Sequence, residues 1–196
     1  MTIQTHKVDP HWNYFLAIER DLDRLSRYIE FDEDNFGCFS IEIARVLLAS
    51  GAEVDVVCKQ VCKAIDANLE PDELKNLRIH GYRDRIKARF PDIPQFHVLL
   101  PRFGLTLTPW DEWNKTNGVP IWWKGYNQIK HERESEYRQS NLQNSLNAVA
   151  GLFVMLLHLY KARNELGSLP IPQLFWVESS HIGGHTFGPT ETSYKL

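Results

Sequence analysis

The sequence has few cysteines and no large excess of charge of either sign. It contains three cysteines in 196 residues, and 22 lysines and arginines stand against 25 aspartates and glutamates, which gives a net charge of −3. A small, odd number of cysteines argues against a disulfide framework. A chain with this charge balance also lacks the global positive field that recruits nucleic acid, so any basic site has to be local.

Long hydrophobic runs are also missing. The strongest apolar stretch, residues 146–160, is interrupted by Asn147 and His158 and is shorter than the roughly 20 residues that a bilayer span requires. It is typical of a buried core helix. Residues 1–10 carry charges and no apolar core of a secretory signal, so we expect a cytoplasmic protein with no membrane partner.

Motifs for common catalytic, cofactor and metal sites do not occur. There is no Gly-x-Ser-x-Gly nucleophile elbow and no glycine-rich phosphate loop between a strand and a helix. Cys58 and Cys62 have a spacing that suits half a metal site, but no second Cys/His pair completes it. His181 and His185 flank two glycines, which disfavour a helix that would bring the rings together. We expect two core cysteines, a solvated C-terminal histidine pair, and no metal or cofactor.

Helical periodicity is the main positive signal. Apolar residues recur in steps of three and four, Ser40 suits an N-cap, and Pro71 suits the first turn of a helix. The pattern predicts helices over residues 12–29, 41–65, 71–89, 121–131 and from Ser140 or Asn141 onward. Such helices bury their apolar stripes most simply in an all-α fold, an antiparallel bundle of four to five helices.

Two segments of the chain lack this periodicity. Residues 91–120 contain five prolines and an alternating apolar tract, which indicates an irregular insertion with room for one β-hairpin. Residues 167–196 are rich in Gly, Pro, Ser and Thr, which predicts an extended C-terminal tail, with residues 174–177 as a short strand or an anchor to the core. We therefore predict a helical domain over residues 10–166, followed by a C-terminal extension.

Four tryptophans lie in the insertion and just after it: Trp110, Trp113, Trp122 and Trp123. Aromatic faces beside basic groups can stack the bases of a single strand. Packing of the insertion onto the bundle is the commoner role for such residues, and we favour it.

Residues 121–133, IWWKGYNQIKHER, carry the clearest chemical pattern. On a helix they form two adjacent polar stripes followed by a cation: Lys124, Asn127 and His131, then Tyr126 and Lys130, then Arg133. We expect the first stripe to be partly exposed, with Trp122 or Trp123 buried behind it. A histidine beside amide and cationic donors has what acid–base work on a phosphodiester needs. The alternative is a satisfied structural Asn–His pair.

The segment YNQIKHER, followed by the helix NLQNSLNAVAGLFVMLLHLY, resembles the HEPN superfamily. The likeness is to uncharacterised bacterial HEPN-like proteins with a variant Tyr-Asn-x3-His motif, and it covers about residues 10–163, with a specific part of about a dozen residues. The resemblance implies a HEPN-like bundle that forms a homodimer. It also implies a metal-independent endoribonuclease of the toxin–antitoxin or phage-defence type, whose motif residues from two protomers meet in the dimer cleft.

The motif can be carried over residue by residue. His131 takes the place of the motif histidine and Asn127 that of the polar residue, whereas the motif arginine falls on Tyr126, whose phenol carries no permanent cation. Three nearby residues are able to supply that charge instead: Lys124, Lys130 and Arg133.

These observations lead to two alternative functions. In the first, RNA is bound and cleaved, with His131, Asn127, Lys130 and Arg133 as catalytic residues, and with Lys124 and Tyr126 contacting RNA or phosphate. In the second, the chain is a non-catalytic homodimeric interaction or scaffold module, beside a partner protein such as an antitoxin. Tyr126 favours the second function, whereas Asn127, His131 and the neighbouring cations favour the first.

Overall fold

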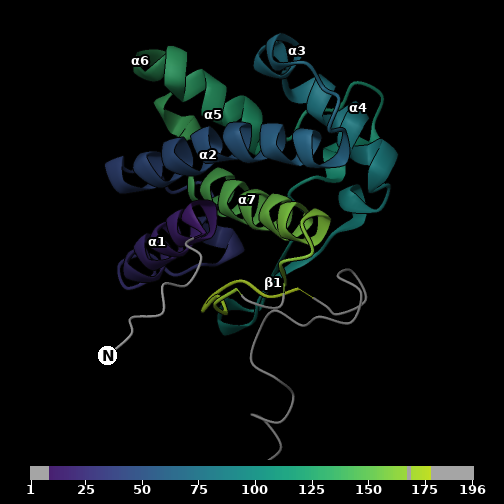
Figure 1. Ribbon diagram of the computed structural model, residues 1–196. Coiled ribbons are helices and arrows are strands. Elements are labelled where there is room, and N and C mark those ends of the chain that lie inside the picture. Colours follow the sequence, from purple (N-terminus) through teal and green to yellow (C-terminus); the bar gives the residue numbers. More distant parts are fainter. Residues whose placement is uncertain (1–8, 167–168, 178–196) are drawn as a thin grey trace, which may run out of the picture.

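The computed structural model describes residues 9–166 and 169–177 and is mostly helical, as predicted for an all-α protein (Figure 1). The helices are α1 (Pro10–Leu25), α2 (Ile41–Ile65), α3 (Pro71–Asn76), α4 (Ile79–Arg89), α5 (Ile121–His131), α6 (Arg133–Glu136) and α7 (Leu142–Ala162). Two short strands, β1 (Val98–Leu100) and β2 (Leu105–Leu107), pair antiparallel. Helices α2 and α7 run side by side through the middle, with α1 on one side and α5 on the other (Figure 1).

Helix α7 forms the centre of the core. It is apolar around most of its circumference, and small residues such as Ala148 and Gly151 let neighbouring side chains approach closely. Among the described residues, α7 is the helix whose length and composition would suffice to cross a membrane, and 89% of its apolar window is buried in the fold. This burial confirms the prediction of a core helix for residues 146–160.

The predicted helix over residues 71–89 is wrong as a single element. It is divided into α3 and α4, because Leu77 and Arg78 adopt extended ψ angles of 143° and 178°. Two side chains bind the backbone carbonyl at the break: Tyr82 Oη donates to the carbonyl of Leu77 at 3.1 Å, and Arg78 Nη1 donates to the same carbonyl at 2.8 Å. Sequence periodicity does not reveal these bonds, and they stabilise a break where the apolar pattern continues.

Two other boundaries differ from the sequence prediction. Helix α1 ends at Leu25 rather than at residue 29, since residues 26–28 continue only as a turn. The charged stretch after His131, which lies between two predicted helices, contains the one-turn helix α6. Neither difference changes which apolar face is buried.

The insertion at residues 91–120 contains one β-hairpin, in agreement with the sequence analysis. Strands β1 and β2 pair from Val98 opposite Leu107, and Gly104 makes the turn with a φ of 65°. Leu99 also exchanges two 2.9 Å backbone hydrogen bonds with Trp176. The prediction that residues 174–177 form a strand or an anchor is thereby confirmed, while the histidine pair at 181 and 185 lies outside the described residues.

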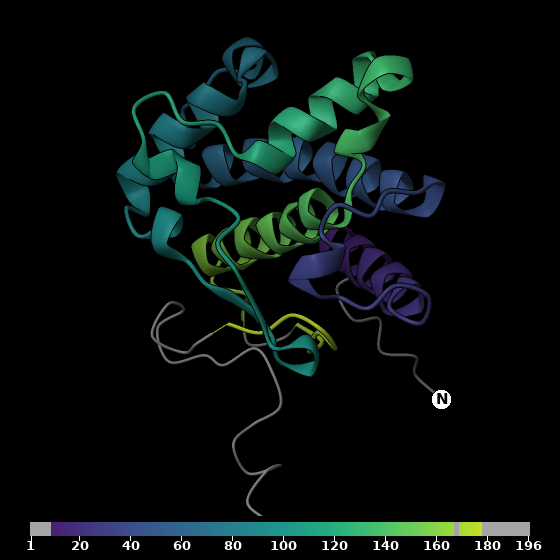
Figure 2. The same ribbon diagram turned by 180° about the vertical axis from the view of Figure 1, so that it is seen from behind.

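The insertion passes over α7 (Figure 2), and four buried tryptophans pack it onto the bundle. Their exposed fractions run from 0% to 7%: Trp110, Trp113, Trp122 and Trp123. Trp122 Nε1 donates to the carbonyl of Pro109 at 2.7 Å, and Trp110 Nε1 donates to the carbonyl of Gly151 at 3.2 Å. The packing role is therefore confirmed, because rings buried to this extent have no face free to stack a base.

Candidate functional site

Helix α5 is held in place by its apolar side. The residues buried on that side pack towards α2 and α7: Trp122, Trp123, Gly125, Tyr126 and Ile129. On the opposite side Lys124 and His131 are exposed and Asn127 is half-buried. The expectation of a partly exposed polar stripe, with the two tryptophans buried behind it, therefore matches the structure.

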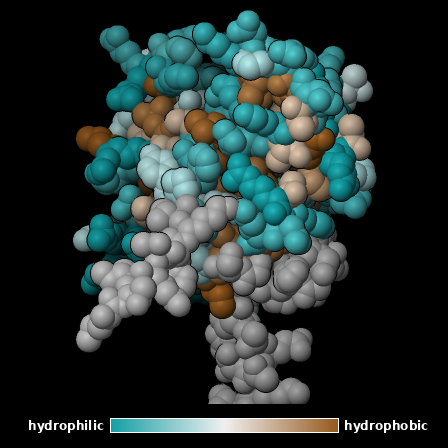
Figure 3. Space-filling view, viewed as in Figure 1, coloured by the Kyte–Doolittle hydropathy of each residue, from teal (hydrophilic) through white to brown (hydrophobic). Residues whose placement is uncertain are grey.

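The polar end of α5 forms one wall of a groove. Helix α2 forms the floor and the α3–α4 junction forms the facing wall, and the cavity has a volume of about 600 Å³. We call it the basic groove, and its lining residues are Ala52, Asp55, Lys59, Lys75, Arg78, Ile79, Trp123, Tyr126, Asn127, Lys130 and His131. In Figure 3 the region over α3, α5 and α6 is mostly hydrophilic. The groove brings together residues that lie up to about 80 positions apart in the sequence.

Cations outnumber carboxylates in this groove. Four lysine or arginine side chains line it, against the single carboxylate of Asp55, which pairs with Lys59 at 2.6 Å between Nζ and Oδ2. Within residues 9–166 and 169–177, no carboxylate lies within ion-pair distance of the other three cations: Lys75, Arg78 and Lys130. The groove therefore has an excess of positive charge open to an anion.

Asp55 is fixed by a second contact. The hydroxyl of Tyr82 on α4 donates to Asp55 Oδ1 at 2.8 Å. Burial, and then this hydrogen bond, raise the pKa of Tyr82 far above its ordinary value. The phenol thus remains a donor at physiological pH and ties the α3–α4 wall to the floor of the groove.

Tyr126 lies in the groove with a buried ring. Its exposed fraction is 4%, and Lys130 Nζ lies 5.4 Å from the ring centroid. A cation at this distance over an aromatic face is attracted to the ring. Tyr126 thus carries no charge itself but attracts the neighbouring cation of Lys130.

Asn127 and His131 do not form a structural pair. Asn127 Nδ2 donates to the carbonyl of Trp123, one turn back, at 3.0 Å. His131 ends α5 with an exposed ring, and the described residues provide no hydrogen bond to either ring nitrogen. The alternative of a buried, satisfied Asn–His pair is therefore wrong, and the imidazole is accessible from the groove.

The three cations that the sequence offered as sources of positive charge lie in different places. Lys130 lines the basic groove, whereas Lys124 is exposed and does not. Arg133 lines a different, shallow depression with His131, where Glu132 and Glu134 flank it and offset its charge. Of the three, Lys130 is therefore the cation that lines the same groove as Asn127 and His131.

The sequence analysis did not identify the groove residues that come from α2 and from the α3–α4 junction. Lys59, Lys75, Arg78 and Asp55 come from α2 and the α3–α4 junction, and no motif connects them to α5. Asp55 and Lys59 form an i,i+4 pair of the kind found on solvated helix faces, so their spacing alone gave no functional signal.

Neither a metal-binding cluster among the described residues nor a related protein identifies the function of the groove. The described residues contain no group of three or more His, Cys, Asp or Glu side chains that could hold a metal ion. Comparison of this chain with protein-family models, with curated proteins and with solved structures found no match in any of the three. The features that indicate a function are therefore the geometry and charge of the basic groove.

Proposed function

We propose that this protein binds RNA in the basic groove and cleaves it there without a metal ion, as a HEPN-like protein with a variant motif. One observation carries the proposal: three cations that lack a carboxylate partner among the described residues line the same groove as an exposed imidazole. These residues are Lys75, Arg78, Lys130 and His131. Cations bind the phosphates of RNA, and an imidazole moves protons near neutral pH. The helical bundle and the place of the motif at the end of α5 also support the HEPN assignment.

The cleavage step follows from these groups. The ribose 2′-hydroxyl loses its proton to His131, and the 2′-oxygen forms a bond to the adjacent phosphorus. The bond from phosphorus to the 5′-oxygen breaks, that oxygen takes up a proton from solvent, and His131 returns its own proton to solvent afterwards. The products are a 2′,3′-cyclic phosphate and a 5′-hydroxyl. Lys130 stabilises the negative charge that develops on the phosphate, and Asn127 orients the ring or the phosphate.

The test is incubation of mixed RNA in chelator with the wild type, His131→Ala and His80→Ala. His80 is an exposed histidine on α4 outside the groove lining, which makes it a matched control. We expect His131→Ala to lower cleavage by roughly a hundredfold to ten-thousandfold and His80→Ala to leave it unchanged, both with wild-type helical content. Salt-sensitive RNA binding without cleavage supports the binding part alone. Neither binding nor cleavage at low salt overturns the proposal.

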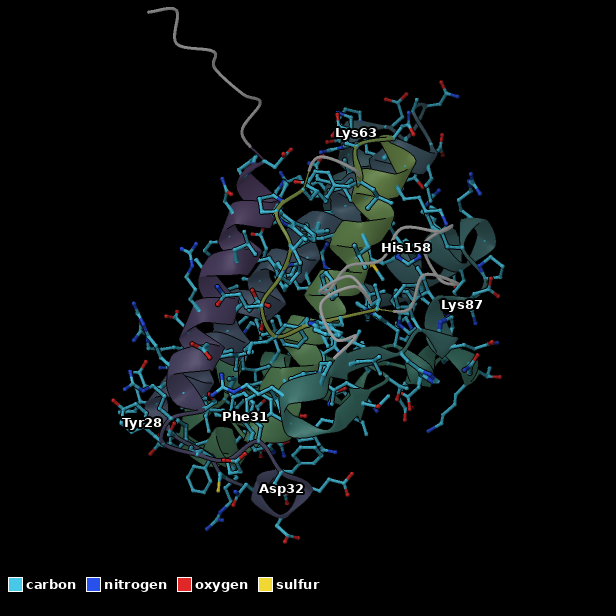
Figure 4. All side chains as sticks on the ribbon, turned by 90° about the horizontal axis from the view of Figure 1, so that it is seen from below. Tyr28, Phe31, Asp32, Lys63, Lys87 and His158 are labelled. Atoms are coloured by element: carbon cyan, nitrogen blue, oxygen red, sulfur yellow. The ribbon has the colours of Figure 1, made fainter. Side chains whose placement is uncertain are left out.

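A second candidate function rests on a different surface. A groove of about 600 Å³ runs between α1 and α2, with apolar residues on its floor and two tyrosines beside it: Ala17, Ile18, Leu25, Val46, Ala49, Tyr14 and Tyr28. Tyr28 is 85% exposed and lies at the periphery beyond the end of α1 (Figure 4). An apolar groove with exposed aromatic side chains at its edge, here Tyr14 and Tyr28, is typical of a protein interaction site.

We propose a second copy of this chain as the occupant of the α1–α2 groove. Its rim carries both signs of charge, as two exposed ion pairs within the chain, Asp21–Arg24 and Glu42–Arg45, and the further cation Arg27. A two-fold axis brings a surface against itself, so a rim with both signs can pair acid with base across the axis. The α1–α2 groove lies on the opposite side of α2 from α5, so this dimer leaves each basic groove within one chain (Figure 1). The chain would then be a homodimeric interaction module.

Light scattering at roughly tens of micromolar tests the dimer. We expect the wild type to have twice the mass of the chain and Ala17→Glu, which places a charge on the exposed edge of the groove floor, to be a monomer. Ile121→Glu is the matched control, since Ile121 is 61% exposed at the start of α5 and lies outside this groove. A monomeric wild type, or a dimer that Ala17→Glu leaves intact, overturns this arrangement.

A further inference from the structure

The wall formed by the α3–α4 junction carries its own pair of cations. Lys75 lies in the last turn of α3, and Arg78 is the residue before α4. Arg78 Nη1 donates to the carbonyls of Lys75 and Leu77 at 3.1 and 2.8 Å, which holds the guanidinium group at the junction. Neither side chain has a carboxylate partner among the described residues, although α3 and α4 carry acids that pair with other cations. Their positive charge therefore faces the groove.

The start of α4 adds to this positive charge. Ile79, the first residue of α4, lines the groove, and the helix has neither a side-chain N-cap nor an acidic residue in its first turn. The unpaired amides of a first turn carry a partial positive charge. The junction thus presents two full charges and a helix end of the same sign.

The two walls of the groove both carry positive charge. Lys130 and His131 belong to α5, while Lys75 and Arg78 belong to the facing wall. Each wall also contributes one nearly buried apolar residue to the lining: Ile79 at the start of α4 and Trp123 on α5, with exposed fractions of 8% and 7%. A ligand that meets both walls therefore needs an anionic group at each end.

We propose that the α3–α4 wall is a second phosphate subsite, so that the groove binds two phosphates joined through one nucleoside. This inference rests on the proposed RNA-binding function and specifies its ligand as a nucleotide step of a single strand. The phosphate at the α5 wall is the one beside His131, and the phosphate at Lys75 and Arg78 fixes the register of the strand. The ribose and base occupy the space between the two walls of the groove.

Calorimetric titration with adenosine 3′,5′-bisphosphate and adenosine 5′-monophosphate, in chelator at low salt, tests the subsite. We expect the wild type to bind the bisphosphate about tenfold more tightly than the monophosphate. Lys75→Glu should bring this ratio close to one. Lys75 is exposed and its amine makes no hydrogen bond to a described residue, so the substitution leaves the fold intact, as circular dichroism will verify. Lys63→Glu, which changes a lysine of α2 outside the groove, should keep the wild-type ratio.

The outcomes separate this inference from the proposed function. A ratio near one for the wild type, or a ratio that Lys75→Glu and Lys63→Glu change equally, overturns the subsite even if RNA is cleaved with dependence on His131. The expected ratios without any RNA cleavage support the subsite and leave the cleavage step without support. If neither nucleotide binds and RNA is neither bound nor cleaved, both proposals are wrong.

Discussion

The ring of Tyr126 packs so closely against the backbone of Gly51 that a β-carbon at position 51 would overlap the ring atoms. The two residues belong to α5 and α2, so the glycine sets how near these helices come at the edge of the basic groove. The ring is 4% exposed, and a guanidinium group in its place would be a charge removed from water. This packing explains why an uncharged phenol suits position 126.

The first prediction concerns this contact. Gly51→Ala should lower the free energy of unfolding by about 1–3 kcal/mol, because the added methyl group forces α5 away from α2 or strains the ring. Gly37→Ala is the matched control, since a β-carbon there would meet nothing within 4 Å. Chemical denaturation followed by circular dichroism measures both. Equal unfolding midpoints for the two variants would show that the helices accommodate the methyl group.

The second prediction concerns the single carboxylate of the groove. Asp55→Asn keeps an oxygen that can accept the hydrogen bond of Tyr82 but removes the charge that pairs with Lys59. RNA should bind more tightly, and the slope of log affinity against log salt should steepen by about 0.7 if Lys59 gains one phosphate contact on a single strand. Asp21→Asn, in a helix ion pair on α1, should change neither quantity. An unchanged slope for Asp55→Asn would place RNA outside the groove.

The third prediction concerns the thiols. Cys58 and Cys62 are buried on α2, which confirms them as core cysteines, whereas Cys38 is exposed. Burial raises the pKa of Cys58 well above its ordinary value and that of Cys62 to about 11, and only the thiolate is a good nucleophile. At pH 8 an alkylating reagent should therefore modify Cys38 alone, and all three thiols after unfolding. Mass spectrometry of peptides identifies the sites, and early labelling of Cys62 would contradict its burial.

The main helices could be predicted because their signals are local. Ser40 accepts a hydrogen bond from the amide of Ile43, and Asn141 accepts one from the amide of Asn144, so both N-caps lie where the sequence suggested. The apolar periodicity between each cap and the end of its helix indicates which face of the helix is buried. The cap and the periodicity of each helix both lie within a few turns of the chain, so they can be recognised in the sequence alone.

The groove could not be predicted because it depends on tertiary contacts. Lys59 and Lys130 face one cavity although 71 positions separate them, and no periodicity relates such distant residues. The break between α3 and α4 is similar, since Tyr82 binds both the carbonyl of Leu77 and the carboxylate of Asp55 on another helix. The motif residues on α5 were visible in the sequence, but the facing wall of their groove was not.

Glu19 is a buried carboxylate that anchors the segment after residue 169. Glu19 is 2% exposed. Its Oε1 accepts hydrogen bonds from the backbone N–H groups of Gln173, Leu174 and Phe175 at 2.9, 2.7 and 3.3 Å. Burial raises the pKa of Glu19, and the three hydrogen bonds oppose that shift only in part. The folded protein therefore holds this proton to a higher pH than the unfolded chain does.

The last prediction follows from that difference. Because the folded state binds the proton more tightly, the contribution of Glu19 to stability falls as the pH rises from the ordinary carboxyl pKa through the raised one. Glu19→Gln keeps the acceptor oxygen without the charge, so it should be at least as stable as the wild type at pH 7 and lack this part of the pH dependence. Glu19→Ala leaves three amides without their acceptor and should lose about 2 kcal/mol or more. Urea unfolding at pH 4, 5.5 and 7 measures all three proteins, and a Glu19→Gln variant that is less stable than the wild type at pH 7 would mean that the charge itself stabilises the anchor.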